Sequence, residues 1–373
     1  MSAMTEISAG KPIDLSPYHG SIIDCDIHPS PPSIAELLPY FDEYWKEVLT
    51  MRGIDRVAVD ITAAPPNVPV NSRPDWRPAK GRPGSDLALM QRHVLDGFGS
   101  AAGICNCLHV AQIVFGDDLA AAMCTALNKW LAAEWLDRDP RLRASIVVPI
   151  QNPQLAAAEI ERWAADRRFV QVLLPGTSDM PYGRRYYWPI YAAAARHGLS
   201  IGIHAGSSYR NAPTPTGWPS YFLSDYIGFS SIAESQLLSL LSEGVFVEYP
   251  NLKVVFIETG FLWYPSFIWR ANKTWRGVRA EVPWLKEAPG TLAERHVRFT
   301  IQPVDAPPTP DQLERAIDQM GSDRFLLFSS DYPHWHYDGL NPLPAGFPTG
   351  LLEKIAVENP TETYPRLQKE TAQ

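Results

Sequence analysis

Acidic and imidazole side chains stand at the ends of four apolar segments that lie far apart in the chain. They are Asp26, His28, His204, Glu258 and Asp331. Alternate side chains of an extended strand share a face, so the Asp-x-His spacing places a carboxylate beside an imidazole. Carboxylates and imidazoles chelate divalent metals and transfer protons. Each could also have an ordinary structural role. Asp26 could cap the next segment beside an exposed His28, and Glu258 could form a salt bridge with a nearby Arg. Together they favour one catalytic site.

Eight apolar runs rich in β-branched residues could form the strands that carry these groups, and amphipathic helical patterns lie between several of them. This alternation predicts parallel strands with helices outside, and eight repeats close a (β/α)8 TIM barrel, here as a single domain over 1–373. The catalytic groups of such barrels sit at the carboxyl ends of the strands. The predicted strands are 22–28, 103–110, 144–149, 169–174, 199–204, 252–258, 297–302 and 324–330, and the predicted helices are 119–136, 155–166, 188–197 and 311–320.

Two proline-rich stretches interrupt the pattern. The stretch at about 50–85 follows the first strand and helix and holds a cluster of prolines, so we expect an insertion that covers the barrel mouth as a lid. The stretch 207–226 follows His204 and predicts a second long loop on the same face. Loops in this position usually select the substrate.

Composition narrows the function classes. The chain has 33 basic and 41 acidic residues, a net charge of −8 and no basic run, which argues against a nucleic-acid or anionic-membrane partner. Neither a signal-peptide pattern nor an apolar run of about 18 residues occurs. We therefore expect a cytoplasmic protein that acts on a small molecule. Cys105, Cys107 and His109 alternate and could form a metal site, although packing inside the barrel is the favoured interpretation.

The chain resembles the amidohydrolase superfamily, specifically the amidohydrolase-related group that contains aminocarboxymuconate-semialdehyde decarboxylase and resorcylate-type decarboxylases. The resemblance spans nearly the whole chain. It rests on the motifs Asp-Cys-Asp-Ile-His-Pro at 24–29, Ile-His-Ala-Gly at 203–206, Leu-Lys-Val-Val-Phe at 252–256 and Phe-Ser-Ser-Asp-Tyr-Pro-His-Trp at 328–335.

The resemblance implies that one divalent metal is held by Asp26, His28, His204 and Asp331. Zinc suits these donors best, with manganese, iron or magnesium as alternatives. Binuclear relatives use a carboxylated Lys on strand four, and 169–174 contains none, which favours one metal. Asp331 would also accept a proton from the metal-activated water as general base.

Three function classes remain open. The leading expectation is a metal-dependent hydrolase that cleaves a C–N or C–O bond, such as an amide or lactone, of a small aromatic or carboxylated molecule. The alternative is a non-oxidative decarboxylase of an aromatic or muconate-type acid, and the third is a barrel without catalysis that is retained for binding. Decarboxylases of the resembled group carry a His on strand six, where this chain has Glu258, a difference that weighs against decarboxylation.

Further expectations concern single residues, one Trp-rich segment and assembly. Glu258 is expected to serve in the catalytic pocket, and His334 to donate a proton, to contact the substrate or to make a structural hydrogen bond. His336 is expected on the loop surface. The Trp-rich segment 263–270 either clamps a substrate or packs a helix or subunit interface, and a homodimer is expected.

Overall fold

Eight parallel strands form one sheet whose order follows the chain, from β1 next to β2 through to β8. The computed structural model describes residues 13–31, 33–54, 71–206, 211–214 and 216–368. The strands are β1 (Ile22–Ile27), β2 (Ser100–Cys105), β3 (Leu142–Val147), β4 (Phe169–Pro175), β5 (Ser200–His204), β6 (Val254–Ile257), β7 (Val297–Thr300) and β8 (Leu326–Leu327). The fold is the predicted (β/α)8 barrel.

The two edge strands of this sheet meet, so the sheet curls into a nearly closed barrel. The backbone N–H of Cys25 donates to the carbonyl of Phe328 (2.9 Å), and that of Asp331 donates to the carbonyl of Asp26 (3.1 Å). The buried side chain of Asp24 accepts from the backbone N–H of Ser330 (3.0 Å). These bonds bring the carboxyl end of β1 against the segment that follows β8.

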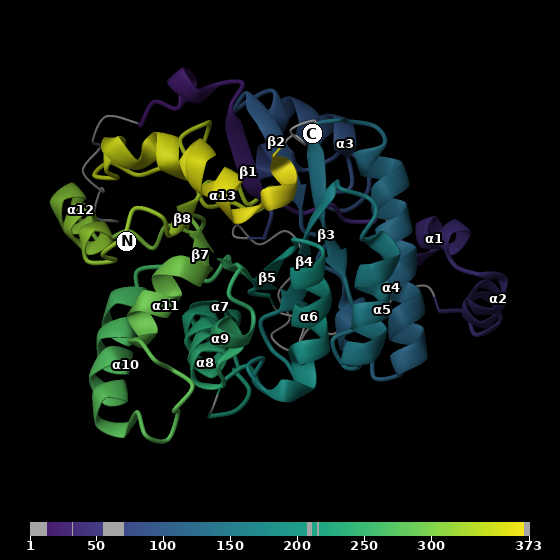
Figure 1. The fold of residues 1–373 in the computed structure, drawn as a ribbon. Coiled ribbons are helices and arrows are strands. Elements are labelled where there is room, and N and C mark those ends of the chain that lie inside the picture. Colours follow the sequence, from purple (N-terminus) through teal and green to yellow (C-terminus); the bar gives the residue numbers. More distant parts are fainter. Residues whose placement is uncertain (1–12, 32, 55–70, 207–210, 215, 369–373) are drawn as a thin grey trace, which may run out of the picture.

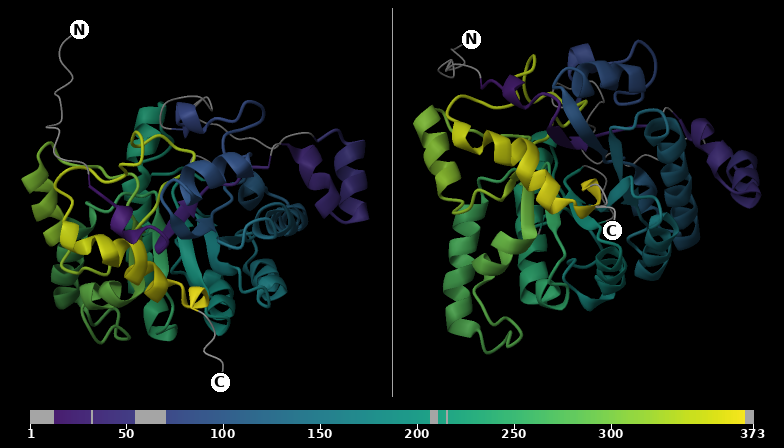
Figure 2. Two further views of the ribbon diagram at one scale, coloured as in Figure 1. Left: turned by 90° about the horizontal axis from the view of Figure 1, so that it is seen from above. Right: turned by 45° about the horizontal axis from the view of Figure 1, so that its top comes forward.

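Most of the helices lie around the outside of the strands (Figures 1 and 2). Their buried apolar residues join those of the strands in the hydrophobic core. The four predicted helices are present and begin within two residues of their predicted starts, whereas the long helices at 229–242 and 264–278 were not predicted. Asn152 caps the start of α5 by accepting from the N–H of Leu155. The helices are α1 (Ile34–Leu37), α2 (Glu43–Met51), α3 (Leu87–Met90), α4 (Asp117–Leu131), α5 (Pro153–Trp163), α6 (Trp188–Arg196), α7 (Phe222–Ile227), α8 (Phe229–Ser242), α9 (Val245–Glu248), α10 (Tyr264–Val278), α11 (Pro289–His296), α12 (Pro310–Asp318) and α13 (Asn359–Thr363). None of the described helices is long and apolar enough to cross a membrane.

Strand β2 begins at Ser100, three residues earlier than predicted, and ends at Cys105 rather than at residue 110. The last bond of its pairing with β1 runs from the backbone N–H of Asn106 to the carbonyl of Ile27 (2.7 Å), and the chain leaves the sheet beyond it. Cys107 and His109 therefore lie beyond the strand and do not continue its alternation. The Cys/Cys/His arrangement is not among the possible metal-binding groups of the described residues.

Part of the expected insertion at about 50–85 packs against the segment after β8. Trp76 is buried, lies 5.2 Å from the ring of Tyr332 and carries the guanidinium of Arg73 over its face at 4.0 Å. Arg73 also donates to the carbonyl of Gly339 (2.9 Å). Residues 55–70 of the insertion, and residues 207–210 and 215 of the second long loop, lie outside the described residues.

Candidate metal and catalytic site

Asp26 and His28 lie at the carboxyl end of β1, and both side chains are buried. The Nε2 atom of His28 is 3.4 Å from Oδ1 of Asp26. Asn106, which follows β2, holds both: its carbonyl accepts from Nδ1 of His28 (2.9 Å) and its side-chain amide donates to Oδ1 of Asp26 (2.8 Å). Because Nδ1 of His28 is the donor, the lone pair of Nε2 faces the site. Sequence reasoning missed Asn106; a polar residue between two cysteines of an apolar run was the available signal.

His204 ends β5 and points at the same place. Its Nδ1 atom lies against the carbonyl oxygen of Ala205, so its Nε2 atom faces Asp26. Nε2 is 3.7 Å from Oδ2 of Asp26 and 3.7 Å from Oε2 of Glu258. Within the described part of the chain, Oδ2 of Asp26 and Nε2 of His204 are buried atoms without a hydrogen-bond partner. Two acceptor atoms that face each other in a dry site repel unless a cation or proton lies between them.

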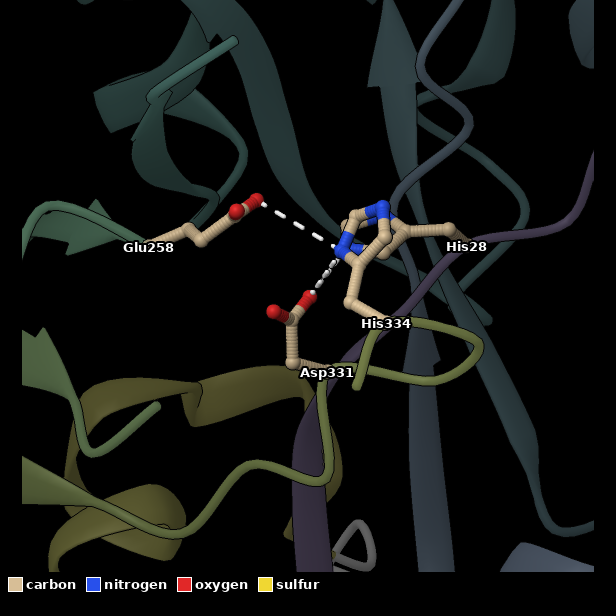
Figure 3. Close-up of side chains that lie close together, drawn as sticks. All are labelled: His28, Glu258, Asp331 and His334. Carbon is tan, nitrogen blue, oxygen red and sulfur yellow. Dashed lines mark hydrogen bonds and ion pairs between the residues drawn. The ribbon is translucent and has the colours of Figure 1, made fainter. Parts of the chain in front are cut away.

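Asp331 follows β8 and contacts three imidazoles, two of which, those of His28 and His334, are drawn in Figure 3. Its Oδ1 atom is 2.8 Å from Nε2 of His28 and 2.8 Å from Nδ1 of His334. Its Oδ2 atom is 2.6 Å from Nε2 of His336. The expectation that His336 is a surface residue is therefore wrong, because the strongly turned segment after β8 folds its side chain back onto Asp331.

Glu258 directly follows β6 and brings a third carboxylate to the cluster. Its Oε2 atom is 3.7 Å from Nδ1 of His334, and its Oε1 atom accepts from the hydroxyl of Tyr226 (3.4 Å). Tyr226 comes from α7, and its hydroxyl is also 3.4 Å from Nε2 of His336. Sequence reasoning missed Tyr226, which is one of several aromatic residues in a long loop.

Two of these carboxylates sit on strained backbone. Among the described residues other than glycine, only Glu258 (φ 57°) and Asp331 (φ 56°) have a positive φ. A side chain other than glycine in this region costs about 1 to 3 kcal/mol, and such positions cluster at functional sites. The turn aims both side chains into the barrel mouth.

The electrostatics of the site separate the carboxyl groups. Burial and the negative charge of Asp331 raise the pKa of Glu258 to about 8. Burial also opposes ionisation of Asp26, but the imidazoles of His28 and His204 outweigh it and lower the pKa of Asp26 to about 2. In the same way His334, His28 and His336 overcome burial and hold the pKa of Asp331 well below its usual value. Asp26 and Asp331 are therefore held in their negatively charged forms, which need positive groups nearby.

The structure brings every predicted site residue into one place. Two overlapping groups have ligand atoms within 4.8 Å of one another. They are Asp26, His28 and His204, and His28, Glu258, Asp331 and His334. The separation between the β1 pair and the groups on β5 and β8, on which the prediction of one shared site depended, is therefore short.

A cavity of about 210 Å³ opens onto this cluster. His204, Glu258 and His334 form its polar floor. Its walls include the aromatic side chains of Phe222, Tyr226 and Phe229 and, from the described part of the insertion, Asn71 and Arg82. The volume is below the roughly 300 Å³ at the low end for drug-sized ligands, so the cavity suits a small molecule.

Comparison with known proteins gives consistent matches. The family model described as amidohydrolase matches residues 23–366. The gamma-resorcylate decarboxylase of Polaromonas sp. is 25% identical over 224 residues, which cover 57% of this chain and 66% of the relative, just under two thirds of its length. That of Rhodococcus jostii is 25% identical over 217 residues, covering 55% of this chain and 64% of the relative. The crystal structure of a dihydroxybenzoic acid decarboxylase from Polaromonas sp., with bound manganese and the inhibitor 2-nitroresorcinol, superposes with a TM-score of 0.67 at 19% identity and covers 95% of this chain and 99% of that one.

The leading expectation of a hydrolase that cleaves a C–N or C–O bond is wrong, because the curated relatives are decarboxylases. The site also gives a physical reason. Hydrolysis was expected to use Asp331 as the base that accepts a proton from water, but three imidazoles surround its carboxylate and hold its pKa low. A carboxylate stabilised in this way is a weak base.

Proposed function

Because the chain belongs to the amidohydrolase family, we propose that it is a metal-dependent decarboxylase that removes a carboxyl group from a small aromatic or muconate-type acid without oxidation. The observation that carries the proposal is the cluster of carboxylates and imidazoles beneath a small cavity with aromatic walls. The names of the relatives support the reaction type.

The residues present fit a divalent cation. Asp26, His28, His204 and Asp331 would hold it, and the two buried acceptor atoms that face each other, Oδ2 of Asp26 and Nε2 of His204, are the clearest sign of such a position. Imidazole and carboxylate donors suit zinc, manganese and iron. Zinc was the first expectation, and the manganese bound by a structural neighbour makes manganese the metal to test first. When bound, such a cation supplies positive charge that holds an anionic acid and draws electrons from it.

The chain's own side chains would position the acid and exclude water. Phe222, Tyr226 and Phe229 form an apolar wall against which a planar ring can lie. The side chain of Arg82 at the rim brings the opposite charge to a carboxylate. Both features favour an aromatic acid over a neutral amide.

Decarboxylation leaves the electron pair of the broken C–C bond on the carbon, which then needs a proton. Three groups that line the cavity can carry that proton: the carboxyl group of Glu258, the imidazole of His334 and the hydroxyl of Tyr226. Asp331 contacts His334 directly and reaches Tyr226 through His336, so it would hold the proton supply in place. This assigns Asp331, Glu258 and His334 to the catalytic machinery.

The test is release of carbon dioxide. Protein loaded with manganese is incubated with hydroxylated benzoic acids and muconate-type acids, and carbon dioxide and the decarboxylated product are measured together. We expect one carbon dioxide for each acid consumed and, in deuterated water, one deuterium at the carbon that lost the carboxyl group. Protein treated with a chelator is the control and is expected to be inactive. Failure of the fully loaded protein to release carbon dioxide from any of these acids would contradict the proposal.

Assembly and location remain proposals as well. A homodimer is supported by large apolar side chains that are exposed on α7 and α10, among them Leu223, Ile227 and Trp269. Light scattering after size-exclusion chromatography measures the mass directly, and a mass of one chain would contradict the dimer. We retain the cytoplasm as the proposed location, which fractionation of the producing cells can test.

A further inference from the structure

We propose that Tyr364 is a positioning residue of the catalytic site, although it enters the barrel from the opposite end. Tyr364 follows α13, and its side chain is completely buried among interior residues of the strands. Its neighbours in the chain bind the amino ends of β4 and β5. The carbonyl of Thr363 accepts from the hydroxyl of Ser200 (2.6 Å), and Arg366 donates to the carbonyl of Phe169 (2.8 Å). The candidate site lies at the carboxyl ends of the strands, so the inference rests on the proposed function of that site.

A continuous line of hydrogen bonds leads from Tyr364 to Asp26 through the barrel interior. The hydroxyl of Tyr364 donates to Oε1 of Gln171 on β4 (3.1 Å). The amide of Gln171 donates to Oδ1 of Asn106 (3.2 Å) and to the hydroxyl of Ser145 (2.8 Å), which donates to the same oxygen of Asn106 (2.6 Å). The amide of Asn106 then donates to Oδ1 of Asp26 (2.8 Å). All five side chains are fully buried, so the line lies away from bulk water.

The direction of each bond in this line is fixed from the end at the site. A carbonyl oxygen only accepts hydrogen bonds, so the atom of Asn106 that lies 3.2 Å from the carbonyl oxygen of Cys25 must be its amide nitrogen. The other end of the Asn106 amide is then an oxygen, which receives its donors from Ser145 and Gln171. Gln171 therefore turns its own oxygen toward Tyr364, where only a donor fits. No other described residue donates to that oxygen.

The packing around Gln171 leaves room for its amide and little else. A side chain at Gly202 on β5 would begin 2.5 Å from Nε2 of Gln171, so the glycine provides the space that this amide occupies. Without the hydroxyl of Tyr364, the amide of Gln171 loses the donor that distinguishes its two ends. An exchange of those ends would place its oxygen against the oxygen of Asn106, and the two would repel. The hold of Asn106 on Asp26 would then weaken.

The experiment compares Tyr364→Phe with Ser200→Ala. Tyr364→Phe keeps the ring and removes only the hydroxyl. Ser200→Ala is the matched control, because it removes a buried hydroxyl that binds the same segment at Thr363, but that bond ends on a backbone carbonyl outside the line. Two measurements are made on full-length protein. The side-chain amide signals of Asn106 are followed by nuclear magnetic resonance in metal-free protein labelled with ¹⁵N-asparagine, and isothermal titration measures the affinity for Mn²⁺.

We expect Tyr364→Phe to shift the amide signals of Asn106, which are assigned by their loss in Asn106→Ala. It should also weaken Mn²⁺ binding by about 3- to 10-fold, less than the roughly 10- to 100-fold that is typical when the direct partner of a ligand is lost. Ser200→Ala should lower the melting temperature and leave the signals and the affinity unchanged.

A purely structural role for Tyr364 predicts that its variant behaves like Ser200→Ala. Unchanged Asn106 signals in Tyr364→Phe would therefore overturn the inference, and so would equal changes in both variants or Mn²⁺ binding as tight as in the wild type. The resonance measurement needs no metal. If the wild type binds no Mn²⁺, the proposed function fails, whereas the Asn106 signals still decide the inference.

Discussion

Replacing Asn106 by alanine tests whether the site depends on the residue that orients it. The side-chain amide of Asn106 donates to Oδ1 of Asp26 (2.8 Å), and its side-chain oxygen accepts from the hydroxyl of Ser145 (2.6 Å) and from the amide of Gln171 (3.2 Å). The carbonyl that holds His28 belongs to the backbone and survives the change. The substitution therefore releases Asp26 and leaves His28 in place.

The size of the effect follows from these contacts. Loss of a hydrogen-bonded partner behind a metal ligand typically weakens metal binding by about 10- to 100-fold, which equals about 1.4 to 2.7 kcal/mol. Asn106→Ala also leaves buried polar groups on Ser145 and Gln171 without this partner, at a cost of about 1 to 3 kcal/mol for each group that stays unsatisfied. We expect weaker Mn²⁺ binding and a lower melting temperature together.

Isothermal titration with Mn²⁺ and thermal unfolding separate the two effects when Asn128→Ala is measured alongside. Asn128 is equally buried and makes three side-chain hydrogen bonds, to Val147 and Glu159, but it lies on α4 outside the barrel. Its variant should lose stability and keep the affinity for Mn²⁺. Unchanged affinity in Asn106→Ala, or an equal loss in Asn128→Ala, would refute the reasoning.

Three other changes have defined outcomes. Asp331→Asn should retain the circular dichroism spectrum and lose at least about 100-fold in kcat, because it removes the negative charge that three imidazoles contact; full turnover would exclude the assigned role. Tyr226→Phe should lower kcat and leave the manganese count unchanged, whereas loss of metal would make the hydroxyl a ligand. Burial opposes ionisation of Asp139, but the side chain and backbone N–H of Arg141 lower the pKa of Asp139. Its stabilising effect should therefore be present above about pH 4 and disappear as the pH falls through the lowered pKa. Urea unfolding of wild type and Asp139→Asn should differ at neutral pH and converge in acid; a gap that persists in acid would contradict this.

The barrel and its main donors could be predicted because they follow from local patterns. Each strand is an apolar run of about the right length, and parallel strands must place their carboxyl ends on one face. Asp26, His28, His204 and Asp331 stand at those ends, so their meeting required no knowledge of loop conformations. The boundary error at β2 arose because the apolar run continues past the point where Asn106 leaves the sheet.

The positions of His336 and Tyr226 could not be predicted, because they depend on turns and tertiary packing that no periodic sequence pattern indicates. His336 reaches Asp331 only because the segment after β8 starts with Asp331 at φ 56° and folds back. Tyr226 reaches the cluster from α7, in a segment that holds several aromatic residues of similar type. In both cases tertiary packing, rather than local preference, decides which side chain faces the cavity.

The misleading signal was Glu258. Its presence on strand six, where the resembled decarboxylases carry a His, counted against decarboxylation because an imidazole was missing from that side of the site. The structure supplies an imidazole there from another element, since Nδ1 of His334 lies 3.7 Å from Oε2 of Glu258 and 2.8 Å from Oδ1 of Asp331. An imidazole is thus present on that side of the site, although it comes from the segment after β8 rather than from β6. A substitution at one strand end therefore says little about a reaction until the groups that converge from the other strands have been placed.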